Sequence, residues 1–242
     1  MKIQQLFDEL EKIKVSTKSD FEKSGMVNRF DEMKYGFFPL GLGVLTENIT
    51  MDSKATEIEI EEGGVMVLGN DFGTVTYVSD VIKDSDGFGE IKGTTVRNMK
   101  KYIPELFTDK TFFTNFYLGV RTNKDAKMMI KIEELSDGYK TLCYDFFRMQ
   151  LDLVKPKLVV CLGHHVKNAL ISTGGVFEQW KPKSGSLKEL YLDGKDKYII
   201  KNTALNRIKF IIIPHPCFLP ELLKGPYLEK LKDFLDPNKQ SS

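Results

Sequence analysis

The segment VMVLGNDFG, residues 65–73, is the strongest indication of the fold in this chain. Four apolar residues in a row followed by a glycine are typical of a strand covered on both faces, because a half-exposed strand would alternate apolar with polar residues. Such strands occur in parallel sheets that carry helices on both sides. We therefore expect a buried strand over residues 65–68, followed by a glycine-rich loop that places a carboxylate directly beyond it.

Three further segments show a similar apolar pattern, and helical segments separate them. The expected strands are TFFTNFYLGV (111–120), KLVVCL (157–162) and IKFIII (208–213), and the expected helices span 94–106, 133–154, from 164 onward, and 218–235 with an interruption at 225–226. Strands that alternate with helices predict a mainly parallel sheet. We expect an α/β fold, a three-layer α/β/α sandwich around a central sheet of about four to five strands.

The length favours one domain with an extension at its N-terminus. The chain has 242 residues, of which 41% are apolar, and this is enough for one well-buried domain. Residues 3–14 place apolar side chains at helical spacing, as in a surface helix. We expect an N-terminal helix and irregular extension over residues 1–60, packed on an α/β domain over residues 61–236, and a frayed tail over residues 237–242.

Charge and hydropathy limit the classes of partner. Lys and Arg number 35 against 34 Asp and Glu, so a formal net charge of +1 provides no overall attraction to DNA or anionic lipid. Any DNA contact must rest on local basic patches. The N-terminus lacks the apolar centre of a signal peptide, and no apolar run reaches the ~18 residues of a membrane span. We expect a soluble, cytoplasmic protein without a membrane partner, and the pattern indicates no oligomeric state.

The three cysteines, Cys143, Cys161 and Cys217, lie far apart and lack the paired spacing of a zinc site. They are also one short of the four thiolates that hold an iron–sulfur cluster. We therefore expect no metal and no other cofactor. Cys143 and Cys161 lie in apolar runs and are expected to be buried core thiols, which suits a reducing cytoplasm.

Ligands of parallel sheets bind beyond the carboxyl ends of the strands. Four segments occupy that position here: residues 70–73, 115–121, 163–165 and 215–219. In the first, Asp71 stands between two glycines, where its carboxylate can orient or deprotonate a water molecule. The alternative is a structural carboxylate that closes an Asx-turn or caps a helix.

A histidine follows the most apolar of the expected strands. His215 stands between Pro214 and Pro216, which restrict the backbone and fix the direction of the imidazole. Such stiffness suits a side chain that must point at a ligand, although a hydrogen-bonded histidine in a turn fits the same pattern. His164 and His165 open an expected helix, where capping or packing explains them.

Two other side chains suit a flat, polar ligand. Asn115 lies within an aromatic strand, and its amide must bond either to the fold or to a ligand with both donors and acceptors, such as the edge of a pyrimidine. Phe88, in the glycine-flanked turn DGFGE, is either an exposed stacking surface or a ring folded back onto the core.

Together these segments resemble the uracil-DNA glycosylase superfamily, in order and in spacing, over residues 62–235. The motifs that carry the resemblance are VLGNDFG, FGEIKG, FTN, LVVCLG and IIPHPCFLPELL. Asp71 stands where the classical uracil enzymes keep a water-activating aspartate. Phe88 stands five residues before Gly93, as does the base-stacking phenylalanine of the similar iron–sulfur branch. Asn115 resembles the asparagine that reads the pyrimidine, and His215 the histidine that stabilises the departing base.

The chain departs from the superfamily pattern at several positions. Phe72 replaces the usual proline of the first motif, and Cys217 stands where the histidine loop usually has serine. Gly73 replaces the tyrosine that excludes the thymine methyl in strict uracil enzymes, which implies a less discriminating pocket. The cluster cysteines of the iron–sulfur branch are absent.

The resemblance implies hydrolysis of the N-glycosidic bond of uracil or another damaged base that is flipped out of DNA. It assigns catalysis to Asp71 and His215. The implied substrate-binding residues are Gly69, Asn70, Phe72, Gly73, Phe88 and Asn115, and the implied DNA contacts are Phe218, Leu219, Arg97 and Lys100.

Two other functions fit the sequence. One is a superfamily member that keeps the fold but binds a nucleotide, a modified base or a protein partner without turnover, because function resides in the site rather than in the fold. The other is an unrelated doubly wound hydrolase or nucleotide-binding protein. The chain carries neither a phosphate loop ending in GK[ST] nor a nucleophile elbow, so the common versions of that class find no support.

Overall fold

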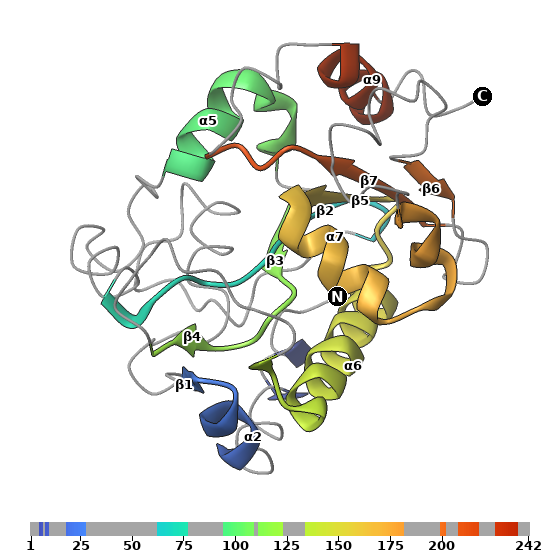
Figure 1. The fold of residues 1–242 in the computed structure, drawn as a ribbon. Helices are drawn as coiled ribbons and strands as arrows, with labels where there is room; N and C mark the ends of the chain where they lie inside the picture. The colour runs from blue at the N-terminus through green and yellow to red at the C-terminus, as the bar shows by residue number, and fades with distance from the viewer. Residues whose placement is uncertain are drawn as a thin grey trace.

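A five-stranded sheet forms the centre of the protein in the computed structural model (Figure 1), with the strand order β3-β2-β5-β7-β6. The structure describes residues 5–6, 8–9, 18–27, 62–76, 94–108, 111–122, 134–181, 199–201, 208–217 and 226–236. The strands of the sheet are β2 (Val65–Gly69), β3 (Thr111–Asn115), β5 (Leu158–Leu162), β6 (Ile199–Lys201) and β7 (Lys209–Ile213). Strands β3, β2, β5 and β7 are parallel, and β6 pairs antiparallel with β7. The prediction of an α/β fold with a mainly parallel sheet is confirmed.

Helices lie on both sides of the sheet, as Figure 1 shows: α6 and α7 on one side, α5 and α9 on the other. The helices are α2 (Lys18–Lys23), α5 (Thr94–Tyr102), α6 (Asp137–Val154), α7 (Gly163–Ser172) and α9 (Pro226–Leu235), with short 3-10 helices η2 (Pro104–Leu106) and η4 (Gly175–Trp180). Among the described helices, none combines the length and apolar character needed to cross a membrane.

The core is built around β5, whose five residues LVVCL are all buried. A central strand with neighbours on both edges and helices on both faces has no exposed side, which explains the unbroken apolar run. Each large aliphatic side chain buried in this way contributes about 1.5–3 kcal/mol. The predicted core thiols Cys143 and Cys161 are both buried, and burial raises the pKa of Cys143 to about 12.

Helix α6 shows how sequence signals set the bounds of an element. Its N-cap Ser136 accepts a hydrogen bond from the Tyr139 amide at 3.2 Å, and it ends at Lys155, which is left-handed with φ 46°. Its buried side chains recur every three or four residues and pack toward the sheet: Tyr139, Cys143, Phe146, Phe147, Gln150, Leu151 and Val154. The Thr114 hydroxyl donates to Gln150 Oε1 at 2.7 Å, which fastens α6 to β3.

Part of the N-terminal region packs beside the carboxyl end of the sheet. Strand β1 (Met26–Val27) pairs antiparallel with β4 (Val120–Arg121). The Phe21 ring meets the Tyr139 ring edge to face, with 5.2 Å between centroids. Residues 1–4, 7, 10–17 and 28–60, and all of the tail 237–242, lie outside the described residues.

Several predicted bounds were wrong for identifiable reasons. The strand predicted over residues 111–120 ends at Asn115, and the amides of the next two residues donate to Gly69, the last residue of β2, and to Asn70 of the loop that follows. The helix predicted over residues 94–106 is interrupted at Ile103, since the residue before a proline avoids helical backbone angles. The antiparallel strand β6 was not predicted, and the described part of the C-terminal helix begins at Pro226.

Candidate functional site

All four predicted strand-end segments begin at the same edge of the sheet, because β3, β2, β5 and β7 are parallel. The chain passes from β2 to β3 on one side and later to β5 on the other side of β2. The carboxyl ends of β2 and β5 therefore flank a topological switch point, where open α/β sheets bind their ligands. Residues 70–73 follow β2 at this point, and residues 163–165 follow β5.

The Asp71 carboxylate is buried and bonded through both oxygens. Its Oδ1 accepts hydrogen bonds from the Gly73 amide at 2.7 Å and from Arg121 Nε at 3.1 Å, and its Oδ2 accepts one from Asn70 Nδ2 at 2.7 Å. The bond to Gly73 spans two residues and closes an Asx-turn, which was the structural alternative for this aspartate. The side chains of Arg121 and Asp71 are only 7% and 6% exposed, so this is a buried ion pair.

These bonds leave Asp71 limited room for chemistry. A carboxylate offers about four acceptor positions, and the three donors occupy most of them. The remaining position on Oδ2 suits one further hydrogen, from a water molecule or a ligand. Arg121 balances part of the negative charge, so Asp71 is better placed to orient a group or to face a positive charge than to remove a proton.

The loop that carries Asp71 is fixed by the chain that follows β3. The Phe116 amide donates to the Gly69 carbonyl, the Tyr117 amide to the Asn70 carbonyl, and the Arg121 amide to the Gly73 carbonyl, each at 2.9 Å. Phe72, a predicted substrate-binding residue, is 2% exposed and belongs to the core, and Asn70 is 8% exposed.

Asn115 is the last residue of β3 and lies beside Gly69 of β2, its partner in the strand register. A Cβ atom at Gly69 would overlap the side-chain oxygen of Asn115, so the glycine makes room for the amide. The Asn115 amide makes no hydrogen bond to any other residue that the structure describes. The structural alternative, an amide bonded to neighbouring backbone, is thus not seen within the described part, and the group remains suited to a ligand.

His215 is largely buried and neutral above acidic pH. Burial lowers its pKa to about 4, an effect that the Asp71 carboxylate partly opposes and that His165 reinforces. Its Nδ1 accepts a hydrogen bond from the Cys217 amide at 3.2 Å, so the neutral ring carries its proton on Nε2. This tautomer makes Nε2 an N–H donor.

Helix α5 holds the histidine loop from the other side. Asn98 Nδ2 donates to the Pro216 carbonyl at 2.7 Å, and the Thr95 hydroxyl lies 3.0 Å from the Cys217 sulfur. The two prolines restrict the loop backbone itself. The loop is therefore fixed by its own residues and by a neighbouring element.

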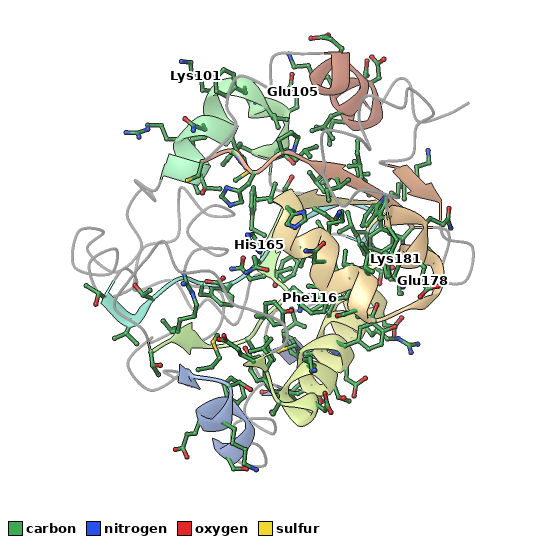
Figure 2. All side chains as sticks on the ribbon, in the orientation of Figure 1. Lys101, Glu105, Phe116, His165, Glu178 and Lys181 are labelled. Atoms are coloured by element: carbon green, nitrogen blue, oxygen red, sulfur yellow. The ribbon has the colours of Figure 1, made fainter. Side chains whose placement is uncertain are left out.

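His165 belongs to the site, although the sequence interpretation assigned it to capping or packing. It stands at the N-terminal end of α7, on the side where the chain leaves β2 (Figure 2). Burial lowers its pKa, the Asp71 charge acts against that shift, and His165 in turn lowers the pKa of His215. These mutual effects place Asp71, His165 and His215 within electrostatic reach of one another. Two consecutive histidines directly after a buried strand were the available signal.

His164 is a packing residue, as predicted. Its Nε2 lies 2.9 Å from Asn168 Nδ2, one turn along α7. Burial lowers its pKa, with further lowering from Lys167 and His165. The two adjacent histidines therefore differ in their surroundings, and only His165 is electrostatically linked to Asp71.

The chain matches no protein-family model, and no curated protein sequence matches it. Function must accordingly be argued from the chemistry of the site. Within the described ranges, no three His, Cys, Asp or Glu side chains gather so as to hold a metal ion. The described groups offer a neutral N–H donor, a buried carboxylate and an amide with both donor and acceptor.

The predicted DNA contacts are described only in part. Arg97 is exposed on α5, and Lys100 is half-buried with its Nζ 5.6 Å from the centre of the Phe107 ring. Lys101, the last residue of the basic stretch 97–101 expected to contact DNA, extends from the same helix to the surface in Figure 2. Three further predicted site residues, Phe88, Phe218 and Leu219, lie outside the described residues.

Proposed function

We propose that this protein is a DNA glycosylase that hydrolyses the N-glycosidic bond of uracil or another damaged base flipped out of DNA, without a cofactor. One observation supports the proposal: Asp71 and His215 follow β2 and β7, Asn115 ends β3, and these parallel strands end at the same edge of the sheet. Each of the three suits a different part of a nucleoside. The finer fold that accompanies the proposal is a sandwich like that of the uracil-DNA glycosylase superfamily.

His215 supplies a donor for the departing base. When the bond to the sugar breaks, negative charge develops on the base, and a preorganised donor at that position is worth about 3–4 kcal/mol. A pKa of about 4 keeps the ring neutral at physiological pH, so it stabilises the anion by a hydrogen bond rather than by transferring a proton. The bond from the Cys217 amide to Nδ1 assigns the donating proton to Nε2.

Asp71 acts on the sugar side of the bond. Its charge faces the positive charge that develops on the sugar, and the remaining position on Oδ2 accepts a hydrogen from the attacking water. The ion pair with Arg121 and the Asx-turn hold the carboxylate in one orientation. This role requires fixed charge rather than strong basicity, and such positioning contributes much of the catalysis available to a buried group.

Asn115 reads the base. A side-chain amide offers two donors and an acceptor, which complement the alternating donors and acceptors of a pyrimidine edge. Gly69 leaves the space in which this amide lies. DNA itself would be bound by local cations such as Arg97 and Lys100 on α5, the helix that contacts the histidine loop.

One observation favours a second function, the binding of a base or nucleotide without turnover. The buried pair of Asp71 with Arg121 partly neutralises the carboxylate that a glycosylase needs. A binding protein would use the same three side chains to recognise the base and would need no free charge on Asp71.

Cleavage of fluorescent oligonucleotides tests the proposal. Single- and double-stranded substrates carry uracil, hypoxanthine or a mismatched thymine, and alkali converts each abasic site to a strand break. We expect cleavage of at least one substrate by wild type, and at least about tenfold slower cleavage by Asp71→Asn and by His215→Ala, equal to about 1.4 kcal/mol of barrier each.

Matched controls separate chemistry from folding. Asp137→Asn removes an exposed carboxylate on α6, and His164→Ala removes the packing histidine, so both should cleave like wild type. All variants are assayed below the temperature at which any of them unfolds. Absence of cleavage by folded wild type with every substrate would refute the glycosylase and favour the binding function, which a thermal shift with uracil or nucleotides would then examine.

A further inference from the structure

We propose that Gly163, the first residue after β5, is a positioning residue that seats His215 in the site. Because Gly163 has no side chain, the backbone and Cβ of His215 pack directly against the corner between β5 and α7. The expected effect on the rate of cleavage rests on the proposed function, because displacement of His215 slows cleavage only if its ring contacts the departing base.

The contact between the two residues is closer than a side chain allows. A Cβ atom at Gly163 would lie 2.7 Å from His215 Cβ and 3.4 Å from both its Cα and its backbone nitrogen. Rotation of the imidazole cannot relieve this overlap, because the atoms concerned are backbone and Cβ. Gly163 also has φ +87°, a conformation that residues with a side chain rarely adopt. Alanine at this position must therefore move the histidine or the corner itself.

The histidine loop cannot absorb such a displacement freely. Pro214 and Pro216 stiffen it, and Asn98 on α5 holds the Pro216 carbonyl at 2.7 Å. The loop is thus enclosed between the α7 corner and α5, and an atom added on one side shifts the ring relative to the carboxyl ends of the strands. A misplacement of about 1 Å in a reacting group can cost about a hundredfold in rate.

Gly174 is a matched control for Gly163. It also has a positive φ, +76°, so the backbone conformation is unfavourable for alanine there too. A Cβ atom at Gly174, however, would meet no other atom within 4 Å. Gly163→Ala therefore introduces a Cβ atom that overlaps His215, whereas Gly174→Ala introduces one at a positive φ that overlaps no other residue.

Ring-nitrogen NMR of the full-length chain reads the position of His215 directly. The protein has only 3 histidines, so long-range proton–nitrogen spectra of histidine-labelled protein are simple, and His215→Gln identifies the resonance. We expect Gly163→Ala to shift the His215 nitrogens as the bond from the Cys217 amide to Nδ1 is disturbed, while Gly174→Ala leaves them unchanged. In cleavage assays kcat should fall by about tenfold to a hundredfold in Gly163→Ala with KM little changed, because the histidine acts mainly in the transition state.

Unchanged His215 nitrogens in folded Gly163→Ala, or equal shifts in Gly174→Ala, would overturn the inference. If Gly163→Ala does not fold, Asn98→Ala releases the same loop from its other side; altered His215 nitrogens then support a seated loop, and unaltered ones refute it. If wild type cleaves no substrate, the proposed function fails while the NMR comparison still decides whether Gly163 positions His215.

Discussion

The carboxyl ends of β2 and β7 each hold a buried titratable side chain, but they hold it by different means. Asp71 after β2 is charged and receives donors from Asn70, Gly73 and Arg121. His215 after β7 is neutral and is held by flanking prolines, by contact with Gly163 and by a bond from the Cys217 amide of its own loop.

The difference follows from the cost of burying charge. A buried carboxylate needs polar partners, because its removal from water is otherwise unfavourable by several kcal/mol. A neutral imidazole needs only a shaped site and a partner for each nitrogen. Removal of a polar partner of Asp71 should therefore destabilise the β2 end. The β7 end should be destabilised when the packing around His215 changes or when the imidazole is protonated.

Loss of the Arg121 side chain should cause the largest decrease in the free energy of unfolding. Arg121→Ala leaves the buried Asp71 carboxylate without its counter-ion, and breaking a buried pair by removing one partner typically costs about 3–5 kcal/mol. Urea denaturation monitored by circular dichroism measures the free energy of unfolding. The control is Lys155→Ala, which breaks the exposed pair with Glu62 and should leave the midpoint unchanged. Equal, small losses in both variants would show that the β2 end does not depend on its charge partner.

The second-largest effect is expected from acidification, which should lower the free energy of unfolding through His215. The unfolded state binds a proton at His215 below about pH 6.5, whereas the folded state resists protonation down to about pH 4. The free energy of unfolding therefore falls as the pH is lowered through this window, by up to about 3 kcal/mol for this group.

Comparison with His215→Gln isolates this contribution. The variant should lose less stability than wild type between pH 6.5 and pH 4, because its side chain does not titrate, and His164→Gln should differ less from wild type. Parallel pH profiles for wild type and His215→Gln would contradict a buried neutral histidine.

A side chain added between the ends of β2 and β3 should cause an intermediate loss of stability. Gly69→Ala forces the Asn115 amide aside, and such overpacking typically costs about 1–3 kcal/mol. In the Asn115→Ala background the same change should cost less, because the overlapped group is gone. A double-mutant cycle from urea denaturation measures this coupling, and strictly additive effects would refute the contact.

The smallest effect is expected from a charge on α5, the helix that contacts the loop after β7. Arg97→Gln should leave stability unchanged while weakening DNA binding and reducing the slope of log affinity against log salt by about 1. Fluorescence anisotropy with a labelled oligonucleotide at several salt concentrations provides the measurement. Lys23→Gln, an exposed cation on α2 far from α5 in Figure 1, is the control and should behave like wild type. Equal slopes for all three proteins would exclude α5 from the DNA contact.

The local pattern of residues was enough to predict the four parallel strands of the sheet, although the predicted end of β3 was wrong and β6 was missed. Segments dominated by apolar residues, 65–68, 157–162 and 208–213, indicated strands buried on both faces, because a half-exposed strand would alternate apolar with polar side chains. The first and the last of these segments placed Asp71 and His215 beyond strand ends, and parallel strands bring such ends to one edge. Bounds failed where distant contacts intervened, as at Asn115, where the following amides bond to the loop after β2.

The partners of those side chains depended on tertiary contacts. Arg121 and Asp71 are 50 residues apart in sequence, and His215 and Gly163 are 52 residues apart. No local periodicity could therefore indicate either contact. The place of His165 in the site was also not predictable from local sequence, because the order of β2, β5 and β7 in the sheet determines its surroundings. Sequence patterns report which residues avoid water and where the chain turns. The neighbours that balance a charge or limit a ring are chosen by how the finished sheet and helices pack.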